Sequence, residues 1–164
     1  SDSESSAPMI WLTGSLWGRT WGHVAIAWLP LLALSGLALL LSYRLDLIVL
    51  GEGTATGLGL NVPRQRVLLL LVATLLASVS VAMVGVMGFI GLMAPHIARR
   101  LVGGAHRLML PVSALVGMLL VVLADGVGRA IAPPIEVSAG ILAALIGAPF
   151  FIYIMLTTDA ESGP

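Results

Sequence analysis

The sequence lacks cysteine and lysine, and it carries little charge of either sign. All eight basic residues are Arg, eight residues are acidic, and the formal net charge is zero. Without cysteine the chain can form neither a disulfide framework nor a thiolate metal site. Zero net charge gives no electrostatic basis for binding nucleic acid, and without lysine there is no Gly-x-x-x-x-Gly-Lys loop with which to hydrolyse ATP.

Apolar residues are in excess and make up 59 % of the 164 positions. Soluble domains rarely exceed about half, so this composition predicts a protein of the bilayer. Four stretches each supply about twenty mostly apolar residues, the length that a bilayer core of about 30 Å requires. They are Val24–Tyr43, Val67–Met87, Leu108–Val127 and Val137–Leu156. We therefore expect an all-α membrane protein with four full transmembrane helices.

The two ends of the chain differ from the spans. Ser1–Pro8 is polar and acidic, which is the wrong charge for a signal peptide, and we expect a disordered leader there. Thr157–Pro164 is expected to be a polar tail. Trp11, Trp17 and Trp21 precede the first span, and tryptophan at that density is typical of a membrane interface.

The arginines between the spans conflict with a simple four-span topology. Arg44, Arg64 and Arg66 lie between spans one and two, and Arg99, Arg100 and Arg107 lie between spans two and three. Four simple spans would place these two loops on opposite faces of the membrane. The positive-inside rule favours the cytoplasm for both.

The conflict disappears if the segment after span two returns through the membrane to the cytoplasmic side. It is apolar but too short for a full span, and we expect a turn at Gly85, Gly88 and Gly91 followed by a half-helix over about residues 92–102. Pro95 suits the first turn of that helix, because its missing N–H costs nothing there. A turn at membrane depth must be buried in protein or line a cavity. This topology predicts an N-terminus outside and a C-terminus in the cytoplasm.

The loop from Leu47 to Arg66 is cytoplasmic in this topology. Leu47, Leu50, Thr54 and Leu58 recur at helical spacing. They predict a short amphipathic helix that stops near Gly57 or Gly59, followed by a turn at Asn61–Pro63. Its apolar face either packs on its own bundle or docks with a partner, and the spacing favours neither.

Four motifs follow one another between residues 9 and 156. They are Trp11–Leu16 with Trp21; Leu50-Gly51-Glu52, Ala55 and Leu58-Gly59-Leu60; Gly85, Gly88–Leu92 and Pro95-His96; and His106-Arg107, Leu110-Pro111, Ala124-Asp125, Arg129 and Gly147–Phe151. In order and spacing they resemble the FecCD-like permease subunits of ATP-binding-cassette (ABC) importers for iron–siderophore, haem and vitamin B12. The resemblance implies the C-terminal half of such a permease over residues 9–156.

The resemblance also implies the partners of the chain. A second permease subunit or the missing N-terminal half would help to enclose the pathway, a substrate-binding protein would deliver the chelate, and ABC ATPase subunits would use ATP. The chain itself would be no enzyme and would bind no cofactor or metal. It would be a multi-pass protein of the cytoplasmic (inner) membrane of a bacterium or archaeon.

Three groups of site residues follow from the resemblance. The ATPase-coupling loop would hold Gly51, Glu52, Ala55, Leu58, Gly59 and Leu60. The half-helix beside the pathway would hold Gly88, Phe89, Gly91, Pro95 and His96, and Arg129 and Glu136 would contact the binding protein. The loop departs from the family pattern, because Gly53 and Gly57 are poor helix formers and Thr56 stands where the family often has Arg.

Several readings stay open beside this one. Glu52 either pairs with an ATPase arginine or caps the short helix. His96 invites a metal or relay role, but His23 and His106 are expected near opposite faces, so turn-fixing is favoured. Asp125 and Arg129 are expected to form an i,i+4 pair. A truncated permease with a structural or assembly role is an alternative to transport; an intramembrane enzyme using Ser78 or Ser80 with His96 lacks a supporting motif.

Overall fold

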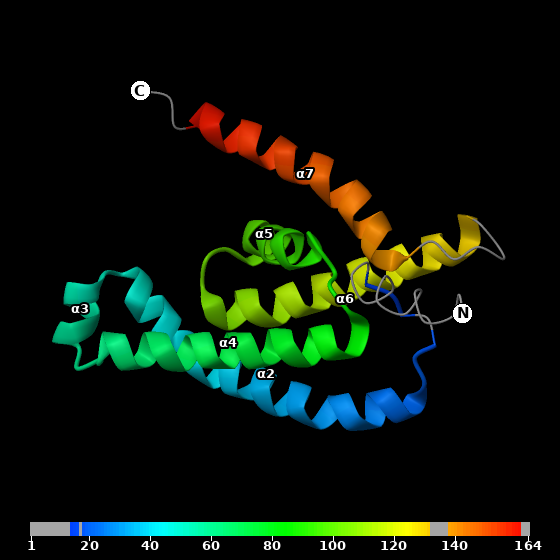
Figure 1. Cartoon of the computed structure of the whole chain (residues 1–164). Helices are drawn as coiled ribbons and strands as arrows, with labels where there is room; N and C mark the ends of the chain where they lie inside the picture. The colour runs from blue at the N-terminus through cyan, green and yellow to red at the C-terminus, as the bar shows by residue number, and fades with distance from the viewer. Residues whose placement is uncertain (1–13, 17, 132–137, 162–164) are drawn as a thin grey trace. The chain divides into compact units, whose positions relative to one another are not determined.

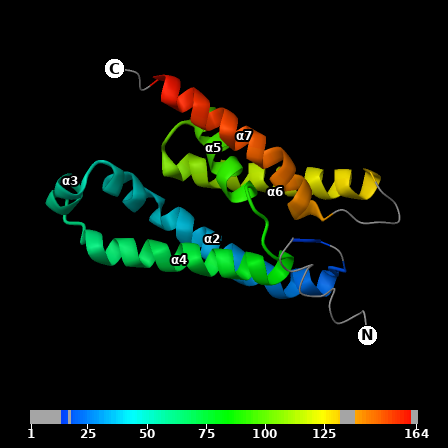
Figure 2. The same ribbon diagram turned by 45° about the horizontal axis from the view of Figure 1, so that its top comes forward.

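The computed structural model describes residues 14–16, 18–131 and 138–161, and these residues form six helices (Figures 1 and 2). The helices are α2 (Trp21–Val49), α3 (Glu52–Gly57), α4 (Val62–Val84), α5 (Ile90–Val102), α6 (His106–Ile131) and α7 (Ala139–Glu161). Within the described residues there is no strand, so the expected all-α fold is confirmed. The leader, Trp11, Trp17, Glu136 and residues 162–164 lie outside the described residues.

Four helices are long and apolar enough to cross a membrane. They are α2, α4, α6 and the Ala139–Thr157 part of α7. Only 6–11 % of the apolar window is buried in α2, α4 and α6, against 33 % in α7. Most apolar side chains of α2, α4 and α6 are therefore not buried within this chain, as expected for spans that rely on the bilayer for their apolar environment.

The chain divides into two compact units. The α2–α4 unit contains residues 18–83 and 98–112, and the α6–α7 unit contains residues 14–16, 84–97, 113–131 and 138–161. In the α2–α4 unit, the two long helices are antiparallel: α2 runs toward the short α3, and α4 runs back from it (Figures 1 and 2). This connection holds the predicted coupling loop.

The boundaries of α2 and α4 lie outside the apolar stretches. Helix α2 continues past Tyr43 to Val49, and α4 begins at Val62, where we expected a turn over Asn61–Pro63. Asn61 caps the new helix, because its Oδ1 accepts a hydrogen bond from the Arg64 N–H (3.3 Å) and its carbonyl accepts one from the Gln65 N–H (3.0 Å). Pro63 lies in the first turn, where the N–H that it lacks has no helical partner in any case.

Helix α5 begins earlier than expected. Helix α4 ends at Val84, and Gly85 then takes a positive φ of 82°, as predicted for a turn there. The carbonyl of Phe89 accepts hydrogen bonds from the N–H groups of Leu92 (3.0 Å) and Met93 (2.8 Å), so the helix starts at Ile90. Pro95 and Gly91 consequently lie inside α5, and the expected place of Pro95 in the first turn is wrong.

Helix α5 is nevertheless too short to cross a bilayer. Its 13 residues correspond to about 20 Å at 1.5 Å per residue, against a bilayer core of about 30 Å. Its buried residues follow one stripe and are Ile90, Met93, Ala94 and Ala98. Leu92, His96 and Arg99 are exposed on the other side, so α5 is an amphipathic short helix.

Candidate functional site

The predicted coupling loop contains two separate helical pieces. Gly51 takes φ 109° between the end of α2 and the start of α3, a value that L side chains rarely adopt. The helix expected from Leu47 to Leu58 is therefore broken: Leu47 belongs to α2, and α3 contains only Glu52–Gly57. A positive-φ glycine ends one helix and lets the chain turn into the next.

Helix α3 has one buried anchor and one exposed apolar end. Ala55 has no exposed surface, and its N–H donates to the Gly51 carbonyl (3.0 Å) while its carbonyl accepts from the Leu60 N–H (3.0 Å). Gly59, at φ 84°, turns the chain toward α4. Leu58 remains 65 % exposed. The loop thus presents an apolar side chain on a backbone that is held from within.

Two polar contacts hold the start of α4, one from α3 and one from α2. Glu52 Oε1 accepts a hydrogen bond from Arg66 Nη2 at 2.7 Å, and both side chains are more than half exposed. Arg44 of α2 donates to Gln65 Oε1. An exposed ion pair of this kind contributes little to stability; this one joins α3 to the start of α4. Glu52 also lies in the first turn of α3, where an acidic side chain suits the helix dipole.

A third contact joins α2 to the start of α6. Asp46 Oδ1 lies 3.0 Å from the backbone N of His106 and 2.6 Å from its ring Nδ1. Asp46 is in the last turn of α2, and His106 is the first residue of α6. This contact brings the turn after α5 to the same end of the α2–α4 unit as α3.

The half-helix residues fall into two groups. Gly88 and Gly91 face open space, and Pro95 and the exposed His96 lie within α5. Phe89 instead takes φ 63° and packs on Gly147 of α7. No cluster of three or more His, Cys, Asp or Glu side chains that could hold a metal occurs in the described part of the chain. His23 hydrogen-bonds its ring Nδ1 to the Thr20 backbone N–H (3.2 Å) at the start of α2.

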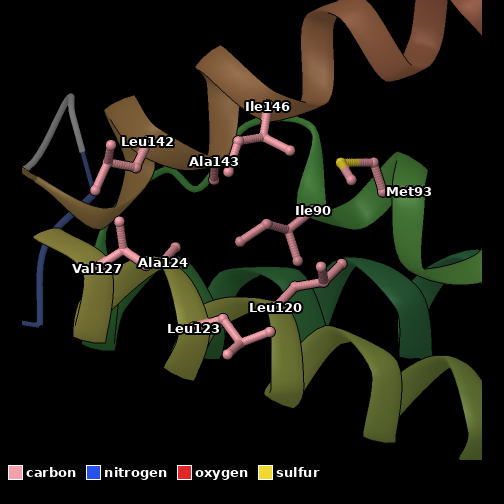
Figure 3. Close-up of a pocket in the computed structure, with 9 residues that line it drawn as sticks. All are labelled: Ile90, Met93, Leu120, Leu123, Ala124, Val127, Leu142, Ala143 and Ile146. Carbon is pink, nitrogen blue, oxygen red and sulfur yellow. The ribbon is translucent and has the colours of Figure 1, made fainter.

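An apolar cavity of about 240 Å³ lies within the α6–α7 unit (Figure 3). Its lining residues come from α5, α6 and α7 and are Ile90, Met93, Leu120, Leu123, Ala124, Val127, Leu142, Ala143 and Ile146. None of these side chains carries a charge or a hydrogen-bonding group other than the Met93 sulfur. The cavity can take hydrocarbon, and it offers nothing to orient a charged chelate.

The segment around Gly14 ties together two helix ends of the same unit. The Ser15 N–H donates to the carbonyl of Val84, the last residue of α4 (3.0 Å). The Gly14 carbonyl accepts from the Gly140 N–H in the first turn of α7 (3.0 Å) and from Ser138 Oγ. Both helix ends have backbone groups without helical partners, and this segment supplies partners for them.

The pair predicted in α6 is confirmed. Arg129 Nε donates to Asp125 Oδ2 at 2.8 Å, one helical turn away. Glu136, the other predicted contact of a binding protein, lies outside the described residues.

Sequence reasoning missed the residues whose partners are distant in the chain. Asp46 and His106 are separated by 60 positions, and Gly14 and Ser138 by 124. One feature of the sequence could have identified Asp46: it is the single acidic residue among the 29 residues of α2. An ionisable group in such an apolar helix needs a partner. No periodicity of the sequence identifies that partner.

Four span-length apolar helices, a short amphipathic helix and a turn that joins two of the spans define a multi-pass membrane protein. A family model, the FecCD transport family, matches residues 1–157. The chain belongs to the FecCD transport family, and the resemblance seen in the motifs is thereby confirmed.

Curated relatives agree with this assignment. The chain is 51 % identical over 150 residues to the Fe(3+)-citrate import system permease protein YfmE of Bacillus subtilis, covering 92 % of this chain and 45 % of that protein. It is 50 % identical to the Fe(3+) dicitrate transport system permease protein FecD of Escherichia coli, over 90 % and 46 % of the two chains. It is 45 % identical to the cobalamin import system permease protein BtuC of Halobacterium salinarum, over 99 % and 43 %. The chain spans about half the length of these relatives.

A solved structure shares the fold. A structure described as an inward-facing metal-chelate type ABC transporter superposes with a TM-score of 0.86 and 36 % sequence identity. The match covers 92 % of this chain and 50 % of the other.

Proposed function

We propose that this chain forms part of the transmembrane permease of an ATP-driven importer of iron–siderophore, haem or cobalamin-type chelates. The observation that carries the proposal is the FecCD family match over residues 1–157, with relatives named for import of ferric citrate and cobalamin. The chain brings spans and connecting loops to the importer; ATP is bound and hydrolysed by partner ATPase subunits. A second permease subunit, or the other half of the permease, completes the pathway.

The α3 connection receives the movement of the ATPase. Its Leu58 side chain is exposed and apolar, and Gly51 and Gly59 supply the positive φ angles of the turns on either side of α3. Ala55 is fully buried and anchors the connection. Closure of an ATPase dimer on ATP would push on this connection and bias the permease between two arrangements. The Glu52–Arg66 pair supports the orientation of α3, which favours an internal role for Glu52 over a contact with an ATPase arginine.

The α3 end of the α2–α4 unit is cytoplasmic. Seven of the eight arginines belong to this unit. Arg19 precedes α2, and the six between the predicted spans are Arg44, Arg64, Arg66, Arg99, Arg100 and Arg107. The Asp46–His106 contact supports a common face for both arginine-rich connections, as a returning α5 requires. An N-terminus outside and a C-terminus in the cytoplasm follow from this arrangement.

Helix α6 then carries Arg129 toward the outer face. Its 26 residues measure about 39 Å, so its start at His106 and its end near Arg129 lie at opposite membrane surfaces. This supports a contact of Arg129, with Glu136, to a substrate-binding protein. The exposed side of α5, which includes His96, would face the pathway beside Gly88, Phe89, Gly91 and Pro95.

The test is reconstitution of the chain with its cognate ATPase, binding protein and complementary permease segment in liposomes. ATP-dependent uptake of ⁵⁵Fe-citrate or of labelled cobalamin, lost when this chain is omitted, is the expected result. Uptake that does not depend on this chain would contradict the proposal. Stable assembly with the ATPase but no uptake of any chelate would instead favour the structural or assembly role.

A further inference from the structure

The Asp46–His106 contact connects the predicted coupling loop to the short helix α5. Asp46 lies in the last turn of α2, which ends at Val49, and α3 is the next helix along the chain. His106 is the first residue of α6 and follows the short turn after α5. We propose that Asp46 and His106 are a positioning pair that makes α3 and the C-terminal end of α5 move as one body. The inference rests on the proposed function, because it concerns how a push on α3 reaches α5.

The chemistry of this contact suits a permanent link. An ionised carboxylate only accepts hydrogen bonds, so His106 Nδ1 carries the hydrogen and donates to Asp46 Oδ1 at 2.6 Å. The same oxygen accepts the His106 backbone N–H at 3.0 Å. As the first N–H of α6, this group has no partner within its own helix, and a carboxylate there also complements the helix dipole.

The Asp46–His106 contact is better protected from water than the Glu52–Arg66 ion pair at the same end of the unit. The His106 side chain is only 13 % exposed and that of Asp46 is 39 % exposed, whereas both members of the Glu52–Arg66 pair exceed half. Charge-assisted hydrogen bonds gain strength when water is partly excluded. The Asp46–His106 contact is therefore stronger than the Glu52–Arg66 pair.

The backbone between α5 and α6 would not by itself fix the position of the C-terminal end of α5. Helix α5 ends at Val102 and is followed by Gly103, at φ 81°, and Gly104. Among the described residues, the Asp46–His106 pair makes the side-chain hydrogen bonds that join residues 98–112 to α2, and no other such bond joins them to α2 or α3. Leu110 lines the same apolar pocket as Leu45 and Ile48, and apolar surfaces around a pocket do not fix the orientation of α5 relative to α2.

The test uses the absence of cysteine, because two introduced cysteines can be spin-labelled without background. Thr54→Cys on α3 and Leu101→Cys in the last turn of α5 are both exposed. The distance between the two labels is measured in the reconstituted complex with the cognate ATPase, with and without ATP and vanadate. In the otherwise native chain we expect the same narrow distance in both conditions. In the Asp46→Ala chain we expect a broader distribution that shifts on adding nucleotide.

Two variants separate positioning from stability. Asp46→Asn keeps an acceptor oxygen at the same place and should restore the nucleotide-independent distance. Thr74→Val removes one hydrogen bond within α4, from Oγ1 to the Leu70 carbonyl (2.7 Å), and should behave as the native chain. If Asp46→Ala does not fold, His106→Ala replaces it, since this change removes the ring bond and keeps the backbone N–H.

The outcomes distinguish the inference from the proposed function. An Asp46→Ala chain that binds the ATPase and keeps the native, nucleotide-independent distance overturns the positioning pair, and a His106→Ala chain that does so overturns the role of the His106 ring in it. Failure of the native chain to bind the ATPase overturns the coupling function instead. In that case the distance distribution measured without nucleotide still tests the positioning pair. An unchanged width in the Asp46→Ala chain contradicts the pair, and a broader distribution supports it.

Discussion

Phe89 packs against the bare backbone of Gly147 in α7. A Cβ atom on Gly147 would lie 2.9 Å from Phe89 Cγ and 3.1 Å from Met93 Sδ. Phe89 itself takes φ 63°, a strained conformation for a residue other than glycine. The turn before α5 and the first half of α7 therefore fit together only when position 147 has no side chain.

Replacing Gly147 with Ala should destabilise the fold. The added methyl group meets Phe89 Cβ first, which cannot move without the backbone of the turn, and overpacking of this kind costs about 1–3 kcal/mol. The measurement is the midpoint of thermal unfolding in detergent, followed by circular dichroism. Gly117→Ala is the matched control, because a Cβ there meets only Ala94 Cβ at 3.6 Å. Equal midpoints for the two variants would show that Phe89 moves aside without cost.

Gly14→Ala should loosen the segment that joins α4 to α7. Gly14 combines a positive φ of 64° with a carbonyl oxygen of Val86 only 2.5 Å from an added Cβ. The left-handed conformation alone costs about 1–2 kcal/mol for an L residue. We expect faster amide hydrogen exchange at Ser15 and Gly140, the donors of this segment. Gly36→Ala, in open space within α2, should leave exchange at both positions unchanged.

Leu58→Asp should uncouple ATP hydrolysis from uptake and leave the fold intact. Because Leu58 is 65 % exposed, its replacement disturbs little packing within the chain. A carboxylate would prevent an apolar contact with an ATPase. ATPase activity and chelate uptake are measured in the same proteoliposomes, with Leu58→Met as the control that keeps an apolar side chain. Native uptake by the Leu58→Asp chain would refute the coupling role of α3.

Single cysteines should establish the membrane topology. We expect Thr56→Cys on α3 and Arg100→Cys in α5 to react with an impermeant maleimide from the cytoplasmic side. Ala130→Cys, at the far end of α6, should react from the outside. The unmodified chain, which has no cysteine, gives the background. Labelling of Arg100→Cys from the outer face would exclude a returning α5.

The sequence predicted features that depend on local composition. Apolar length identified the spans that became α2, α4, α6 and α7, because a bilayer core requires about twenty such residues. The short helix α5 followed from counting arginines. The boundaries were less accurate: the first span was expected to end at Tyr43, and Pro95 was expected in the first turn of the half-helix, whereas α2 ends at Val49 and α5 begins at Ile90. Helix ends depend on which terminal N–H and C=O groups find hydrogen-bond partners, and the length of an apolar stretch does not predict this.

The sequence by itself determined a four-span helical membrane protein of the FecCD type with a short additional helix. Hydropathy, charge distribution and motifs are properties of single positions and near neighbours, so they can be read along the chain. Only the tertiary structure decided that Asp46 meets His106, that Gly14 serves the ends of α4 and α7, and that Phe89 needs Gly147. These contacts depend on how distant segments come together in space, and no spacing in the sequence encodes their distances.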